Sequence, residues 1–163
     1  MIEIPAGVEV AVHEKQLTVK GKNGEVVRML SPLVVVTVSG RSVDIQGKSK
    51  ALINTTQAHL RNMIKGVQDG FKITMKLIFA HFPISIEVKN TDITIKNFLG
   101  EKQARKAKLV GKTKLEVKAK EQLVILTGPD KEAVGGSYSN LRTAMKIKEK
   151  DGRVFQDGVY IIE

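Results

Sequence analysis

The chain has 163 residues, of which 42% are apolar, and its formal net charge of +10 is divided evenly between its two halves. That length suits one medium domain or two small ones, and a surplus of positive charge concentrates polyanions, of which nucleic acid is the commonest and an anionic membrane the second. The absence of cysteine excludes disulfides, zinc ribbons and a thiol nucleophile and fits a reducing cytosol, and we expect neither a signal peptide nor a membrane-spanning segment.

The sequence repeats itself, and this repetition indicates how the chain is organised. Apolar positions of the first half recur in the second, and from residue 34 onward they recur with a constant offset, which separates Val34 from Leu115 and Arg61 from Arg142. The matching segments are 4–10 with 82–88, 17–20 with 93–96, 34–47 with 115–128, and 59–64 with 140–145. We therefore predict a duplicated domain, with the first repeat at residues 1–80 and the second at residues 81–163.

Each half begins with predicted β-strands. A strand introduced by proline comes first, because proline is tolerated where no ladder hydrogen bond is donated. An alternating strand follows, containing Leu17 and Val19 in one half and Ile93 and Ile95 in the other. A glycine-marked turn then leads into a β-branched hairpin. The hairpin strands are predicted at residues 33–38, 42–46, 114–118 and 122–126.

One helix closes each half. An apolar stripe at helical spacing predicts a helix over residues 50–65, which Gly66 and Gly70 end. The second helix is predicted over residues 130–145, where the charge of Asp130 suits the positive end of the helix. The fold class is therefore α+β, with two tandem copies of a small domain, each an antiparallel sheet with one helix packed on one face.

Motifs for catalysis or metal binding are weak. The sequence at Gly111–Thr113 resembles the end of a phosphate-binding loop, but Lys106 stands where that motif needs glycine. The three histidines have no partner at helical spacing, so we expect no metal site. Asp151 and Asp157 lie in turn-like sequences. We expect no enzyme, cofactor or small-molecule substrate, although scattered serine, histidine and aspartate residues leave a small hydrolase as a third alternative.

Basic residues concentrate in the second half. Residues 101–120 contain eight lysines or arginines against two glutamates. On a strand, alternate lysines face one side, which predicts a lysine face formed by Lys112, Lys114, Lys118 and Lys120. The alternative is an ordinary solvated edge strand, since charge there discourages edge pairing. Because aromatic residues are scarce, stacking of bases on an open sheet is disfavoured, and contacts to phosphate and sugar are the expected mode.

Two adjacent glycines interrupt the second predicted helix. Gly135 and Gly136 each cost about 1 kcal/mol relative to alanine in a helix interior. Either close approach of the helix backbone to another surface or tight packing of helix on sheet accounts for them. The first half has Asn54 and Thr55 at the corresponding positions, so this feature belongs to the second half alone.

Several motifs together resemble a known family. They are AHFPI at residues 80–84, NFLGEK at 97–102, LTGPDKEAVG at 126–135 and RVFQDGVYI at 153–161, with RNMIKGVQDGF at 61–71. The whole chain resembles the L-six family, the sixth-numbered proteins of the large ribosomal subunit, in its archaeal and eukaryotic branch. The resemblance implies a cytoplasmic, structural protein that binds large-subunit rRNA near the sarcin–ricin loop and the stalk base, mainly through its second domain. Neighbouring ribosomal proteins and translation factors would lie nearby.

The resemblance also implies a contact surface in the second half. Lys102, Arg105, Lys106, Lys146, Lys148 and Arg153 would neutralise phosphates, and Gly100, Gly135, Gly136 and Gly158 would let backbone come close. The remaining residues of this surface are Asn97, Phe98, Lys108, Ser137, Asn140, Arg142 and Gln156. The alternative function is a basic module that binds polyanions or a membrane surface. A membrane binder needs an apolar face beside charge on a helix, and neither predicted helix is strongly basic.

Overall fold

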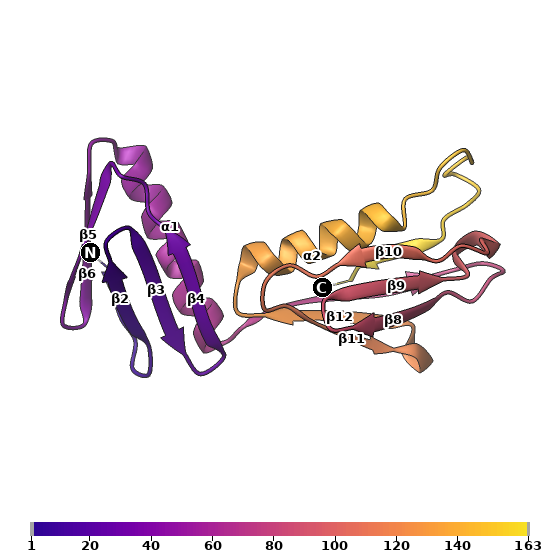
Figure 1. Cartoon of the computed structure of the whole chain (residues 1–163), viewed down its shortest axis with the longest axis horizontal. Coiled ribbons are helices and arrows are strands. Elements are labelled where there is room, and N and C mark those ends of the chain that lie inside the picture. Colours follow the sequence, from indigo (N-terminus) through magenta and orange to yellow (C-terminus); the bar gives the residue numbers. More distant parts are fainter. Residues whose placement is uncertain (1, 163) are drawn as a thin grey trace. The chain divides into compact units, whose positions relative to one another are not determined.

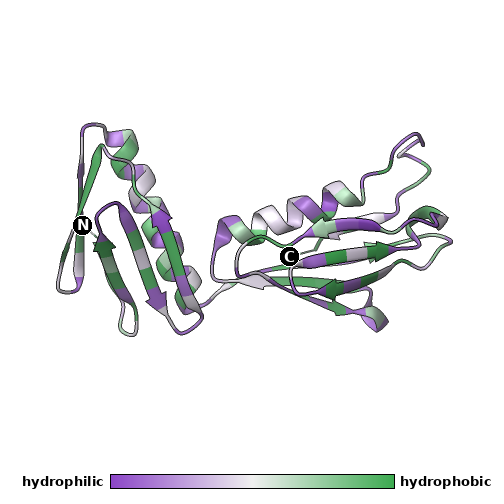
Figure 2. Cartoon of the chain, in the orientation of Figure 1, coloured by the Kyte–Doolittle hydropathy of each residue, from purple (hydrophilic) through white to green (hydrophobic). Residues whose placement is uncertain are grey.

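Alternating apolar residues near the amino terminus form a three-stranded antiparallel sheet in the computed structural model, which describes residues 2–162 (Figure 1). Strands β2 (Glu9–His13), β3 (Gln16–Gly21) and β4 (Gly24–Met29) pair so that Val19 lies opposite both Val10 and Val26. Hydrophilic and hydrophobic bands alternate along these strands (Figure 2). The alternation directs one face of the sheet to the core.

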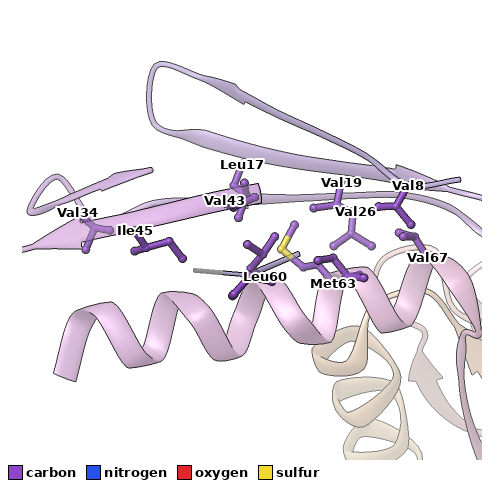
Figure 3. Packing of buried hydrophobic residues seen from close by; sticks show 12 residues of the cluster. Val8, Leu17, Val19, Val26, Val34, Val43, Ile45, Leu60, Met63 and Val67 are labelled. Carbon is purple, nitrogen blue, oxygen red and sulfur yellow. The ribbon is translucent and has the colours of Figure 1, made fainter. Parts of the chain in front are cut away.

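A second sheet and a helix complete this first unit. Strands β1 (Ile2–Glu3), β6 (Ser42–Gly47) and β5 (Val34–Ser39) form an antiparallel sheet in that order, and α1 (Lys50–Gln68) contacts β3, β4 and β6. Figure 3 shows the core between the strands and α1, where Leu17, Val43 and Leu60 are completely buried. Each such side chain contributes about 1.5–3 kcal/mol by leaving water.

The second unit repeats this plan. It has a sheet of three strands, a sheet of four strands and one helix. The elements are β8 (Ser85–Lys89), β9 (Asp92–Lys96), β10 (Arg105–Lys108), β11 (Lys114–Lys118), β12 (Leu123–Gly128), α2 (Lys131–Ala144), β7 (Phe71–Ile78) and β13 (Gly158–Ile161). The four-stranded sheet has the order β11-β12-β7-β13. Its core includes the fully buried Ile93, Ile95, Leu126 and Leu141.

The two units meet in the sequence earlier than expected. One unit contains the residues up to Phe71 together with Pro129–Lys131, and the other contains Lys72–Gly128 and the chain from Glu132. The sequence pattern predicts the boundary at residues 80–81 and does not predict strand β7. β7 belongs with the second unit because it pairs with β13, with Leu77 opposite Val159.

The predicted fold class is confirmed, with two refinements. The strands of each unit form two small antiparallel sheets rather than one, and α1 extends past the expected end at residue 65. The lysine face is shorter than predicted, because only Lys114 and Lys118 lie on β11. Lys120 belongs to the short 3-10 helix η2 (Ala119–Glu121). Neither helix within residues 2–162 has the length and apolarity required to cross a bilayer.

Candidate nucleic-acid interface

A groove runs between strand β10 and helix α2 of the second unit. One part has a volume of about 750 Å³, and its lining residues are Lys89, Asp92, Thr94, Lys106, Ala107, Lys108, Asn140, Thr143 and Ala144. The next part, of about 440 Å³, shares Lys106, Thr143 and Ala144 with the first and adds Glu101, Gln103, Ala104, Arg105 and Lys148. We call the two parts together the β10–α2 groove. Its walls combine basic side chains with short polar and apolar residues and with the carboxylates of Asp92 and Glu101.

The lysines of the groove are placed by the strand geometry. Within residues 2–162, β10 is an edge strand that pairs only with β9. Its exposed residues Lys106 and Lys108 are two positions apart, so they face the same side. Lys106 lies opposite Thr94, and Lys108 lies opposite Asp92. Both predicted contact lysines are therefore brought together, whereas Lys102 is exposed on the preceding loop.

Helix α2 supplies the other wall. The Asn140 side-chain amide donates a hydrogen bond of 2.9 Å to the Lys108 carbonyl oxygen, which ties the helix to the edge strand. Asn140 remains exposed, as does the predicted contact residue Arg142. Arg142 instead lines a separate hollow of about 460 Å³, together with Lys146 and Tyr160. The predicted surface is therefore divided between two hollows.

The two glycines of α2 differ in their surroundings. A Cβ atom at Gly135 would meet nothing within 4 Å, so packing inside the described chain does not require glycine there. A Cβ atom at Gly136 would lie 3.5 Å from a methyl group of Val110, which is an ordinary contact. Tight packing of helix on sheet therefore does not account for Gly135.

Ser137 does not belong to the surface, which corrects the sequence-based prediction. Its side chain is completely buried. The Ser137 hydroxyl donates to the Ala133 carbonyl oxygen at 2.8 Å and accepts from the Val110 backbone N–H at 2.8 Å. These two bonds join α2 to the chain that follows β10, so the residue is part of the interior.

Arg105 is also placed differently from the prediction. Its guanidinium donates to both carboxylate oxygens of Glu101, at 2.8 and 2.5 Å, and to the carbonyl oxygens of Ala144 and Lys146, at 2.9 and 2.8 Å. The hydrogen bond from Arg105 is the main cause that holds the pKa of the Glu101 carboxyl below its usual value. The charge of Arg105 is already compensated, so we remove it from the phosphate contacts.

Phe98 lies in the loop at residues 97–104, and its burial corrects the prediction that it belongs to the contact surface. Its ring is almost completely buried, in the short 3-10 helix η1 (Phe98–Gly100), and Arg105 lies over the ring at 4.4 Å from its centroid. The Asn97 side-chain amide donates to the Pro83 carbonyl oxygen at 3.1 Å. Gly100 is exposed at φ +76°, where a Cβ atom would also lie 3.2 Å from the Phe82 ring.

Most, but not all, of the contact residues predicted in the carboxyl-terminal part of the chain are exposed. Lys146, Lys148, Arg153 and Gln156 are exposed, but Gly158 is buried at the start of β13. Of the exposed residues, Lys148 lines the β10–α2 groove and Lys146 lines the separate hollow. Arg153 and Gln156 line neither of these hollows.

The comparison with protein families bears on both units. The model for "Ribosomal protein L6" matches residues 4–70 and 82–158. The chain belongs to the ribosomal protein L6 family. The family resemblance and the internal duplication that the sequence predicts are thereby confirmed, and the chain is a ribosomal protein rather than an enzyme.

Three ribosomal proteins are similar in sequence to this chain over nearly its full length. The chain is similar to the "Large ribosomal subunit protein uL6" of Methanobrevibacter smithii, with 48% identity over 99% of this chain and 93% of the relative. The proteins of the same name from Methanocella arvoryzae and Methanosarcina mazei are 42% and 39% identical, over 98% and 99% of this chain and 93% and 94% of the relatives. These organisms are archaea, as expected from the resemblance to the archaeal and eukaryotic branch of the family.

Several groove residues of this L6 family member were absent from the sequence-based set. Lys89, Thr94 and Thr143 line the groove but were not predicted. Lys89 and Lys108 both lie opposite Asp92, in the β8–β9 and β9–β10 pairs, so the register places the two lysines on either side of Asp92. Only the pairing of three strands reveals this neighbourhood, and no local motif at Lys89 indicates it.

Proposed function

We propose that the chain is a structural constituent of the large ribosomal subunit and binds large-subunit rRNA through the β10–α2 groove. Its site would lie near the sarcin–ricin loop and the stalk base, where it would support the factor-binding region during translation. Neighbouring large-subunit proteins and translation factors would be its other partners. The single observation that carries this proposal is the basic groove in a chain of the L6 family.

The mode of binding follows from the residues of the groove. Lys106 and Lys108 present two cations on one face of an edge strand. Lysines bind phosphate oxygens as point charges, and such contacts position a protein on nucleic acid without reading its sequence. The exposed amide of Asn140 and the hydroxyl of Thr143 offer partners for the 2′-hydroxyls that the shallow minor groove of A-form RNA displays.

Gly135 supports close approach of α2 to the RNA. Its Cα faces open space, because an added Cβ atom would have no neighbour within 4 Å. A glycine that the fold does not require costs helix stability, and approach of another backbone or a sugar offsets that cost. Gly135, Gly100 and the groove residue Lys148 thus remain proposed contacts. The proposed contacts at the periphery are Arg142, Lys102, Lys146, Arg153 and Gln156.

The salt dependence of binding tests the groove directly. Each phosphate neutralised contributes about 0.7–0.9 to the slope of log K against log salt concentration. We expect Lys106→Ala/Lys108→Ala to weaken binding to large-subunit rRNA and to lower that slope by about 1.5. The control is Lys114→Ala/Lys118→Ala, because β11 is also an edge strand and its two lysines are exposed on one side of the strand, although they are four positions apart rather than two. The control pair is expected to bind as wild type does.

Two outcomes of this experiment would contradict the proposal. Equal losses for the two lysine pairs would indicate a general polyanion binder without a defined groove. An unchanged slope for the β10 pair would mean that these lysines are only a solvated surface. Sedimentation of tagged protein in a cell extract completes the test, since we expect it to migrate with the large subunit at low and high magnesium, and protein that remained free at both would contradict the ribosomal role.

A further inference from the structure

The guanidinium of Arg105 joins two segments that form one end of the groove. Its Nε and one Nη hydrogen-bond the Glu101 carboxylate in the loop at residues 97–104. The other Nη donates to the carbonyl oxygens of Ala144 and Lys146, where α2 ends. Helix carboxyl termini have carbonyls without an intrahelical partner and carry partial negative charge, so a cation there is favourable.

The loop that Arg105 holds has an unusual backbone. Asn97 and Leu99 have positive φ values of 60° and 51°, and Gly100 has φ +76°. Residues other than glycine adopt this region rarely, and they stay there only when their surroundings fix them. Here the fixing contacts are the buried Phe98 ring, the Asn97 hydrogen bond to Pro83, and the Arg105 guanidinium that covers the ring.

We propose that Arg105 is a positioning residue for RNA binding, which holds the loop at residues 97–104 and the end of α2 in the binding conformation without touching RNA itself. The inference rests on the proposed function of the groove and goes beyond it by assigning the loop geometry to one side chain. Lys102 and Gln103 are exposed on this loop, and Lys148 follows the end of α2. Arg105 thus fixes how far Gln103 and Lys148 stand apart across the groove.

Direct contact of Arg105 with a phosphate is disfavoured by its surroundings. The side chain is only 19% exposed, and its charge faces a carboxylate with which it makes a two-point contact. Binding a phosphate would require this contact to break, and fork-shaped pairs of this kind are among the strongest hydrogen-bonded pairs in proteins. Lys102 and Lys106 are exposed and need no such exchange.

Substitution of Arg105 separates positioning from direct contact. We expect Arg105→Lys and Arg105→Gln to weaken rRNA binding alike, by about tenfold, if the competent loop conformation falls to about a tenth of the population. The salt slope is expected to stay as in wild type, because no phosphate contact is lost. Hydrogen exchange at the amides of Gly100 and Glu101, which bond to Asn97 and Phe98, is expected to quicken in both variants. Affinities are compared far below the unfolding temperature of each variant.

Three results would overturn this inference. A slope lowered by about 0.8 in Arg105→Gln but retained in Arg105→Lys would mark a phosphate contact. Unchanged affinity of the folded variants would mark a residue that serves stability alone. If the Arg105 variants do not fold, Glu101→Gln takes their place, because it weakens the same contact at a partly exposed side chain. It is expected to weaken binding with the slope unchanged, and unchanged affinity there would equally overturn the inference.

The failure of the groove proposal would look different. In that case the wild-type protein itself would bind without steep salt dependence, or Lys106→Ala/Lys108→Ala would behave as the β11 pair does. If Arg105 only stabilises the fold, the lysine pair would still alter the slope, while the Arg105 variants would keep the affinity of wild type. The two proposals can therefore fail separately.

Discussion

Strand β4 of the first unit and strand β10 of the second unit are corresponding edge strands, and their exposed side chains differ in chemistry. In the first unit, β4 places Val27 opposite Thr18 and Met29 opposite Gln16, and both apolar side chains are more than half exposed. In the second unit, β10 places Lys106 opposite Thr94 and Lys108 opposite Asp92. The pairing register makes Lys106 the counterpart of Val27 and Lys108 the counterpart of Met29. The two units thus share the pairing of these strands. They differ in the side chains on the solvent face of this one strand, which are basic in the second unit.

The connection before this strand differs as well. β3 and β4 are joined by a turn of two residues between Gly21 and Gly24, whereas β9 and β10 are joined by the loop at residues 97–104. By register, Arg105 is the counterpart of the buried Val26, since these residues lie opposite Ile95 and Val19. The second unit therefore has, at the position of a core valine in the first unit, the arginine that holds its longer loop.

The largest expected effects on stability come from buried core residues that occupy corresponding positions in the two units. Leu60 and Leu141 occupy corresponding helix positions, and both are completely buried. We expect Leu60→Ala and Leu141→Ala each to lower the free energy of unfolding by about 2–5 kcal/mol, through lost burial and the cavity left behind. Denaturant unfolding of the whole chain measures both. A loss below about 1 kcal/mol for either would contradict the equivalence of the two cores.

Substitution of Gly135 in α2 is expected to change stability and RNA binding in opposite directions. Gly135→Ala is expected to raise the free energy of unfolding by about 1 kcal/mol, because alanine favours the helix and its methyl group meets nothing. The same substitution is expected to weaken rRNA binding by placing a methyl group between the helix and the RNA. Thermal unfolding and rRNA titration measure the two effects. Stabilisation without weaker binding would leave the glycine unexplained by RNA contact.

A smaller effect comes from pH, because Glu101 is partly exposed. The folded pKa of Glu101 lies below its ordinary value of 4.5, chiefly through the Arg105 hydrogen bond, with Lys150 and Lys148 adding lesser attraction. A lowered folded pKa stabilises the fold above the unfolded pKa, and that contribution is lost as pH falls through the folded pKa. Stability measured from pH 6 to pH 3 is thus expected to fall less in Glu101→Gln than in wild type. Identical profiles would contradict the contact.

The smallest effect is expected on the first unit's edge strand. Val27→Ser/Met29→Ser removes exposed apolar groups, so we expect the free energy of unfolding to change by no more than about 0.5 kcal/mol per substitution. Binding to isolated large-subunit rRNA is expected to match wild type, because the cationic face belongs to the second unit. A loss as large as that of Lys106→Ala/Lys108→Ala would remove the contrast between the two strands.

Local patterns in the sequence predicted most of the fold. The alternation of Leu17 and Val19 placed a strand, and the helical stripe through Leu60 placed α1. Strand β7 was not predicted, although Phe71, Ile73, Met75 and Leu77 alternate with other residues, because no matching segment of the repeat covers residues 71–78. The helix of the second unit was placed to within one residue at each end, despite its two glycines.

The candidate site was less predictable, because exposure depends on tertiary contacts. The repeat itself held a signal for Ser137, whose counterpart Thr56 is also buried and also bonds a carbonyl one helical turn earlier. Glu101 lies only four residues before Arg105, but the other partners of Arg105, the carbonyl oxygens of Ala144 and Lys146, are distant in sequence. The family resemblance implied phosphate contacts for Lys106 and Arg105 alike, and only the fold separates the exposed cation from the compensated one.

The structure of the assembled large subunit with this chain bound tests the central claim most directly. We predict that the ammonium groups of Lys106 and Lys108 lie within about 4 Å of rRNA phosphate oxygens, which is the distance of an ion pair. Arg105 is predicted to keep its contacts with Glu101 and the end of α2 in that complex. Lysines of β10 that faced bulk solvent, with rRNA bound at another surface of the chain, would contradict the account.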